Sequence, residues 1–367
     1  MQRFRATSAE VDLDAVRHNV RLLRPDGSEL MAVVKANGYG HGDVPVARAA
    51  LEAGATWLGV ALVEEGVRLR EAGIEAPILV LSEFPAGSEK DALAAELTPS
   101  VYTERGASAL AEAARAVGRE VGAHVKVDTG MRRVGLPLER AVPFVRALLQ
   151  AGLRLEGLWS HLAVADQVDD AFTGLQLSRF RQAEEELAAA GFVPASRHVA
   201  NTAATMAVPE SHLDLVRVGI GLYGIAPGPD LEGRGLRPAM RWRAAVAMTK
   251  RVGAGEGISY GLRYAPERET TIATVGIGYA DGYARSLTNV GRVLIRGRRY
   301  PVAGTVTMDQ TMVDVGNDPV EVGDEVVLLG PQGNEEITAN ELGGWTGTIG
   351  YEVTCSVGAR VPREYRG

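Results

Sequence analysis

Eight short apolar runs, separated by amphipathic stretches rich in Ala, Glu and Arg, recur between residue 31 and about residue 220. A short apolar run followed by an amphipathic stretch is the pattern of a buried strand and a crossover helix, and such units build parallel sheets. Eight units in this length favour a closed (β/α)8 barrel, with an open doubly wound sheet as the alternative. The runs are MAVVK (31–35), WLGVA (57–61), ILVLS (78–82), PSVY (99–102), AHVKV (123–127), LEGLWS (155–160), RHVA (197–200) and LVRV (215–218).

The pattern changes near residue 238, after the segment GLRPAM. Apolar runs then follow at short spacing with glycine-rich turns, as in a mostly β domain, and TANELGG (338–344) is the only clear helical insert. We therefore expect an α/β chain of two domains, with residues 1–236 as the barrel and residues 237–367 as a β domain.

The charge and cysteine content exclude several classes of protein. Lys and Arg number 39 against 46 Asp and Glu, and no basic block is present, so nucleic-acid binding is disfavoured. Cys355 is the only cysteine, which rules out an intrachain disulfide, and the N-terminal segment lacks the apolar core of a signal peptide. No apolar run approaches the roughly 18 residues needed to span a bilayer. We expect a cytoplasmic protein without a membrane partner.

Polar side chains gather at the C-terminal ends of the predicted strands, where barrels of this kind carry their chemistry. Lys35 closes the first run, and desolvation at a dry strand end lowers the pKa of an amine and makes it a nucleophile towards an aldehyde. The alternative is a lysine that only extends into solvent. Arg217 lies within the eighth run, where a buried guanidinium needs a partner such as His161, a ligand ring nitrogen or structural carboxylates. The other polar residues at strand ends are Ser82, Tyr102, Lys126, Asp128, Arg133, Asn201 and Thr202.

Two further features lie near these strand ends. The pairs NT (201–202) and GI (219–220) follow the last two strands, where barrels often hold a phosphate through backbone N–H groups. Strand alternation places His124, Lys126 and Asp128 on one face, and a simple Lys–Asp pair would account for them without a ligand.

The C-terminal domain carries four unusual motifs, ISYGLRY (258–264), IGYADGY (277–283), TMDQ (307–310) and GYEVTCS (350–356). Three of them set a tyrosine beside a glycine, at Tyr260, Tyr279 and Tyr351. Taken singly, such tyrosines are more often half-buried sheet residues than catalytic groups.

Together these motifs resemble the alanine racemases. AVVKANGYGHG (32–42) is similar to the cofactor-lysine motif of that family, and the agreement continues in order through KVDTGMRRVG, HLAVAD, VRVGIGLYG, ISYG, GYADGY, TMDQ and GYEV. One lysine–glycine motif is a weak signal, but an ordered set across nearly the whole chain is highly specific. The family fold is an N-terminal (β/α)8 barrel with a C-terminal β domain, in agreement with the pattern of apolar runs.

The resemblance implies pyridoxal 5'-phosphate bound as an imine to Lys35. Arg217 would face the pyridine nitrogen with His161 hydrogen-bonded behind it, and Arg133 would contact the phenolic oxygen and the substrate carboxylate. Lys126 matches a lysine that some members carbamylate to pair with that arginine. The other cofactor-binding residues implied are Tyr39, Asn201, Thr202, Gly219, Ile220 and Tyr351.

The resemblance also implies the interconversion of L- and D-alanine, which supplies D-alanine for peptidoglycan, by homodimers with shared active sites. Moving the α-proton from one face to the other needs two bases and an electron sink, which the cofactor supplies. Lys35 would serve the D-enantiomer, and Tyr260 from the other subunit the L-enantiomer. Substrate contacts are implied for Arg133, Tyr279, Met308 and Asp309, and no metal is expected.

Two positions depart from the family pattern. Many relatives have Ser where this chain has Thr202, and many have an arginine where GTVTMDQ has Thr305. In the family that arginine lines the substrate access, where Asp166 and Arg285 would also lie, so its absence leaves the strictness for alanine open. The alternatives are a racemase of broader preference, such as for serine, and a non-catalytic pyridoxal phosphate carrier. Small carriers lack a domain bearing ISYG, so Tyr260 argues against the second.

Overall fold

The computed structural model describes residues 5–367, and the chain divides into two compact units. The barrel unit consists of Val16–Gly38 and Asp43–Arg237. The β unit contains Pro238–Gly367 together with Tyr39–Gly42 and the N-terminal segment that ends at Ala15. Compared with the predicted division at residue 236, the N-terminal segment therefore joins the β unit, because its strand pairs there.

The barrel unit holds eight parallel strands in two four-stranded sheets, ordered β4-β3-β2-β9 and β5-β6-β7-β8. A parallel bridge between Leu79 and Thr98 joins the sheets at one junction, and a hydrogen bond from Arg217 N to Ala200 O (3.1 Å) joins them at the other. All eight predicted strands are confirmed, including the short ones. They are β2 (Glu29–Val33), β3 (Trp57–Val60), β4 (Ile78–Val80), β5 (Ser100–Val101), β6 (Gly122–Lys126), β7 (Arg154–Trp159), β8 (Ser196–His198) and β9 (Leu215–Val218).

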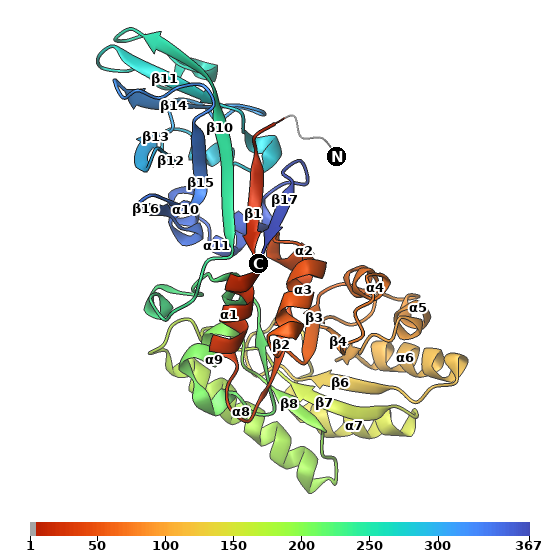
Figure 1. Ribbon diagram of the computed structural model, residues 1–367. Coiled ribbons are helices and arrows are strands. Elements are labelled where there is room, and N and C mark those ends of the chain that lie inside the picture. Colours follow the sequence, from red (N-terminus) through yellow and green to blue (C-terminus); the bar gives the residue numbers. More distant parts are fainter. Residues whose placement is uncertain (1–4) are drawn as a thin grey trace. The chain divides into compact units, whose positions relative to one another are not determined.

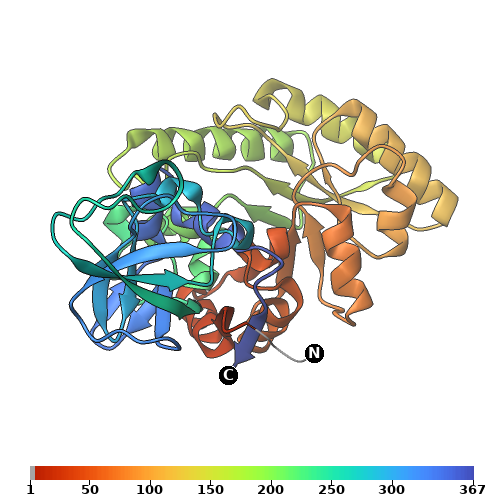
Figure 2. The same cartoon turned by 90° about the horizontal axis from the view of Figure 1, so that it is seen from above.

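Amphipathic helices cover the outside of these strands, and Figure 2 shows the yellow and green helices on the outer side of the barrel. In α6 the apolar side chains recur at helical spacing and are buried, Thr103 caps the N-terminus through Gly106 N, and Gly118 ends the helix in the left-handed region. The segments assigned as helices are α1 (Leu13–Leu23), α2 (Lys35–Tyr39), α3 (Asp43–Glu52), α4 (Val63–Glu71), α5 (Glu89–Ala94), α6 (Glu104–Val117), α7 (Ala141–Gln150), α8 (Ala171–Ala189) and α9 (Thr202–Ala207).

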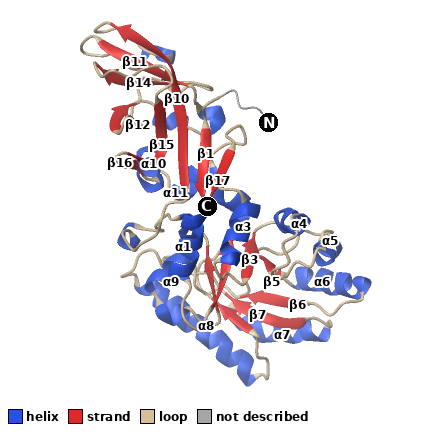
Figure 3. Ribbon diagram, in the orientation of Figure 1, coloured by secondary structure: helices blue, strands red, loops and turns tan. Residues whose placement is uncertain are grey.

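The β unit is built on a nine-stranded sheet, red in Figure 3. Its first strand β1 lies between β10 and β17, so both ends of the chain enter the same sheet (Figure 1). Burial alternates along Met240–Val246, as expected for a strand with one buried face. The strands are β1 (Ser8–Asp12), β10 (Met240–Val252), β11 (Thr270–Val275), β12 (Arg292–Ile295), β13 (Arg298–Pro301), β14 (Thr311–Gly316), β15 (Glu325–Gln332), β16 (Glu335–Ile337) and β17 (Arg363–Arg366).

Two helices complete the β unit. The predicted helical insert is confirmed as α10 (Ala339–Thr346), which Thr338 caps by accepting a hydrogen bond from Glu341 N. Helix α11 (Gly350–Cys355) follows and carries Tyr351. Within residues 5–367, no helix is long and apolar enough to cross a membrane.

Candidate active site

Lys35 follows β2 and opens a turn of left-handed backbone. The next three residues, Ala36–Gly38, have φ of 52°, 53° and 60°, a region that residues other than glycine and asparagine rarely adopt. Glu65 stabilises the turn, since its Oε1 accepts from Ala36 N (2.6 Å) and its Oε2 from Ala61 N (2.8 Å). This buried carboxylate therefore fixes the backbone immediately after Lys35.

Arg217, in β9, is buried among neutral acceptors. Its guanidinium donates to the carbonyl oxygens of Ser160 (2.7 Å), His198 (2.9 Å) and Val199 (3.1 Å), and to Nδ1 of His198 (2.9 Å) and His161 (3.2 Å). No described carboxylate pairs with it, so the interpretation as a bridge between carboxylates is wrong. Burial lowers its pKa to about 9, which leaves it a cation at neutral pH.

The histidines around Arg217 have defined tautomers. A guanidinium only donates, so Nδ1 of His161 and of His198 accepts, and each neutral ring carries its proton on Nε2. His198 Nε2 then donates to His124 Nδ1 at 2.8 Å. Burial, reinforced by the charge of Arg217, lowers the pKa of His124 to about 3 and the pKa values of His161 and His198 well below their usual range. The result is a one-directional chain of hydrogen bonds from the cation Arg217 through neutral His198 to neutral His124.

Trp159, the last residue of β7, contacts the ring of His198 and the basic side chains of Lys126 and Arg217. It stacks on His198 with ring centroids 5.6 Å apart and an interplanar angle of 13°. Lys126 Nζ lies 4.1 Å and Arg217 Cζ 4.9 Å from the centroid of its ring. Sequence reasoning missed both Trp159 and His198. A signal was available, because Trp159 ends β7 two residues before the predicted His161, and His198 ends β8 three residues before the predicted Asn201.

Lys126, the last residue of β6, is buried and makes no ion pair with Asp128, so a simple Lys–Asp pair does not account for it. Burial lowers its pKa to about 7, and the positive charges of Arg217, Arg133 and Lys35 act in the same direction, while Asp128 opposes them. The charges of three predicted site residues, Arg217, Arg133 and Lys35, therefore act on Lys126. Such a concentration of positive charge favours an anionic ligand.

The turns after β8 and β9 are tied together by Thr202. Its hydroxyl oxygen accepts from Gly219 N (3.0 Å) and Gly221 N (3.4 Å), and Ile220 begins a short 3-10 helix, Ile220–Tyr223. Asn201 caps α9 through its side-chain oxygen. The predicted residues Asn201, Thr202, Gly219 and Ile220 thus form one cluster of hydroxyl and backbone groups.

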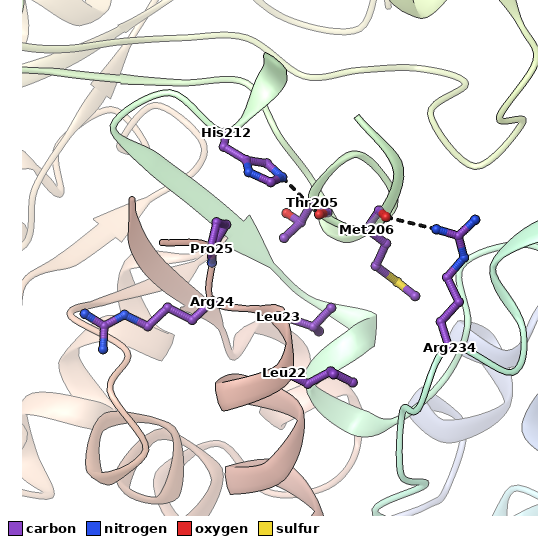
Figure 4. A pocket seen from close by; sticks show the side chains of 8 residues that line it. All are labelled: Leu22, Leu23, Arg24, Pro25, Thr205, Met206, His212 and Arg234. Atoms are coloured by element: carbon purple, nitrogen blue, oxygen red, sulfur yellow. Dashed lines mark hydrogen bonds between the residues drawn. The ribbon is translucent and has the colours of Figure 1, made fainter. Parts of the chain in front are cut away.

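A cavity of about 280 Å³ lies at the other end of α9, and none of the predicted site residues lines it (Figure 4). There His212 Nε2 bonds to Thr205 O (3.0 Å) and Arg234 Nη1 donates to Met206 O (3.1 Å), which satisfies carbonyl groups near the C-terminus of the helix. These contacts support α9. The cavity is lined by Leu22, Leu23, Arg24, Pro25, Thr205, Met206, His212 and Arg234.

The β unit brings Tyr39 and Tyr351 together, with ring centroids 6.3 Å apart. Gly40 allows this approach: it has φ of 84°, and a β-carbon there would overlap the carbonyl oxygen of Thr354 in α11. Arg363 Nε donates to Gly40 O (2.9 Å) from the neighbouring strand β17. The tyrosine within AVVKANGYGHG thus lies beside the tyrosine of GYEV.

The remaining predicted residues lie on the surface of the β unit. Tyr260, Tyr279 and Met308 are 76%, 41% and 53% exposed, so Tyr260 in particular is no half-buried sheet residue. Tyr279 N donates to Thr307 O at 3.0 Å, which sets the IGYADGY and TMDQ turns side by side. Asp309 pairs with Arg360 at 2.7 Å. Among residues 5–367, no group of three or more His, Cys, Asp or Glu is arranged to hold a metal ion.

A cluster of basic side chains lies at the strand ends of a (β/α)8 barrel, where barrel enzymes carry their active sites. This chain matches the family models of the alanine racemase N-terminal domain over residues 11–227 and C-terminal domain over residues 239–365. The chain belongs to the alanine racemase family.

Similar proteins cover almost the full chain. The alanine racemase of Symbiobacterium thermophilum is 52% identical over 99% of this chain and 98% of its own, and that of Frankia casuarinae is 48% identical over 97% and 95%. Among solved structures, the alanine racemase from D-cycloserine-producing Streptomyces lavendulae has a TM-score of 0.95 and 43% identity, covering 100% of this chain and 98% of its own.

Proposed function

We propose that this chain interconverts L- and D-alanine with pyridoxal 5'-phosphate held at the strand ends of the barrel. The observation that carries the proposal is the buried cation Arg217, which donates only to neutral acceptors and stands among Lys35, Lys126 and Arg133. Family membership at up to 52% identity supports alanine as the substrate. A homodimer with shared active sites, a cytoplasmic location and the supply of D-alanine for peptidoglycan complete the proposal.

The residues present fit this cofactor. Its phosphate and phenolic oxygen are anionic and suit the cation cluster described above. We assign to the phosphate the hydroxyl of Thr202 and the backbone at Gly219 and Ile220, with Asn201 shaping the same turn. We also assign to it the side chains of Tyr39 and Tyr351, which lie beside each other in the β unit. When bound, the cofactor supplies an electron sink for the charge left by removal of the α-proton.

The side chains of this chain then have separate tasks. Lys35 holds the cofactor and moves the proton on the face of the D-enantiomer. Arg217 would face the ring nitrogen and, because it stays cationic at neutral pH, would donate a hydrogen bond there while keeping its proton, with His161 accepting a second hydrogen bond from it. Arg133 neutralises the substrate carboxylate.

The second base is Tyr260, which acts on the L-enantiomer in the active site of the partner subunit. Its exposure on the β unit supports this, since a base that serves another subunit must be accessible. We assign Tyr279, Met308 and Asp309 to substrate contacts. Residues 1–236 would thus carry the cofactor, apart from the phosphate contact of Tyr351, and residues 237–367 would carry the second base.

The test follows α-proton exchange and chirality together in deuterated water, with L-alanine and separately L-serine, on the protein loaded with pyridoxal phosphate. We expect racemisation of alanine far ahead of serine. Comparable rates would reassign the chain to a broader racemase, and cofactor binding without exchange would reassign it to a carrier.

The variant Tyr260→Phe tests the assignment of the two bases. It should abolish α-proton loss from L-alanine, while D-alanine still loses its proton to solvent without inversion, because Lys35 remains. Equal loss on both faces would contradict the two-base assignment.

A further inference from the structure

Tyr260 is carried by a tight turn of the β unit, Ser259–Leu262. Leu262 N donates to Ser259 O at 3.0 Å, and Gly261 has φ of 75° and ψ of 6°, the angles of the third residue of a type II turn. Since Tyr260 is 76% exposed, contacts with neighbouring side chains do little to orient it. The direction of its phenol therefore depends on the backbone of the turn.

That backbone is strained at the residue before Tyr260. Ser259 has φ of 64° and ψ of −174°, a combination that is essentially reserved for glycine. A residue with a β-carbon keeps such a conformation only when the surrounding structure holds it there. Other residues must therefore hold Ser259 in this conformation.

Thr305 provides this hold through two reciprocal hydroxyl bonds. Ser259 Oγ donates to Thr305 O at 2.7 Å, and Thr305 Oγ1 donates to Tyr260 O at 2.7 Å. Thr305 is only 2% exposed, so water competes little for these bonds. One buried threonine thus bonds to the strained residue and to the carbonyl of the proposed base.

The neighbours of Thr305 join the same two segments. Gly304 has φ of 85°, and a β-carbon there would lie 2.7 Å from Ile258 O, so glycine permits the close approach. Asn289 bridges both sides, accepting from Gly304 N (2.6 Å) and donating to Arg263 O (2.9 Å). The turn is therefore held against residues 304–305 from both ends.

We propose that Thr305 and Ser259 are positioning residues, which hold the strained turn so that Tyr260 presents its phenol in one direction. This inference rests on the proposed function, in which Tyr260 is a base. It also gives the buried Thr305 a task inside the β unit.

The test compares Thr305→Val, which removes the hydroxyl at nearly constant shape, with Thr305→Ser, which keeps it. Thr311→Val is the matched control, because Thr311 is equally buried and its hydroxyl donates to Ile277 O (2.8 Å) in another part of the β unit. Ser259→Gly is a second variant that removes the other hydroxyl and the strain together.

The first measurement is hydrogen–deuterium exchange of the backbone amides of residues 258–262 in the cofactor-loaded protein. We expect exchange about tenfold faster in Thr305→Val and Ser259→Gly, the factor for loss of one well-formed hydrogen bond, and little change in Thr305→Ser and Thr311→Val. Unchanged exchange in Thr305→Val, or an equal increase in Thr311→Val, would overturn the proposal.

The second measurement is α-proton loss from each enantiomer of alanine. In Thr305→Val the rate of α-proton loss from L-alanine should fall about tenfold, because a displaced base removes the proton slowly. The exchange of the α-proton of D-alanine without inversion should be retained. Thr305→Ser should restore the L-alanine rate. An equal fall for both enantiomers would refute the positioning role, whereas absence of racemisation by the unmodified protein would refute the proposed function instead.

Discussion

The unfolding free energy of the protein should decrease when the pH falls from 7.5 to 5.0. In His124→Gln this decrease should be smaller by about 2 kcal/mol. His124 is fully buried, and its pKa is lowered from 6.5 to about 3 by burial and by the charge of Arg217. A lowered histidine pKa means that the folded state disfavours the proton. The contribution of His124 is therefore fully present above pH 6.5 and is lost as the pH falls towards 3.

The magnitude follows from linkage. At pH 5.0 the folded ring stays neutral, while the unfolded ring binds a proton with a pKa 1.5 units above the solution pH. Each pKa unit corresponds to about 1.36 kcal/mol, so this proton stabilises the unfolded state by about 2 kcal/mol. The value depends little on the folded pKa, because any folded pKa well below 5 gives the same result.

The assay is urea unfolding at pH 7.5 and 5.0 and at one protein concentration, for the unmodified protein and for His124→Gln. The glutamine weakens the bond to His198 at both pH values, so the difference between the two values isolates the titration. His18→Gln is the matched histidine replacement outside this cluster, since the ring of His18 is partly exposed and bonds Gly235 O (2.9 Å). Equal losses in the unmodified protein and His124→Gln would refute the reasoning.

Two further predictions concern the packing and the turn around the site. In Gly157→Ala the added β-carbon would overlap the His124 ring, so we expect a loss of about 2 kcal/mol in unfolding free energy. The control Gly174→Ala has open space around the added β-carbon in α8 and should be neutral or stabilising. Equal effects of the two variants would contradict this account. In Glu65→Gln an amide group replaces an oxygen that accepts from backbone N–H groups in the turn after Lys35, so the racemisation rate should fall about tenfold. The control Glu64→Gln changes an exposed residue and should keep nearly the unmodified rate. Equal rates in the two variants would show that the turn does not position Lys35.

The local pattern of the sequence was sufficient for much of the fold. All eight barrel strands and helix α10 lie where the apolar runs and the segment TANELGG predict them, because strands that are buried on both faces consist of continuous apolar runs. The motifs likewise located Lys35, Arg217 and the turn bearing Tyr260, since each stands out against the residues beside it.

Tertiary structure alone decided the contacts between distant segments. Strand β1 pairs with β10 and β17, more than 200 residues away, and local periodicity carries no information about such partners. His198 looked like an ordinary strand residue until the barrel set it between Arg217 and His124. The sequence by itself determined which segments are strands and which motifs mark the family. Only the folded chain decided which hydrogen bonds orient the residues of those motifs, because each such bond joins two groups that lie far apart in the sequence.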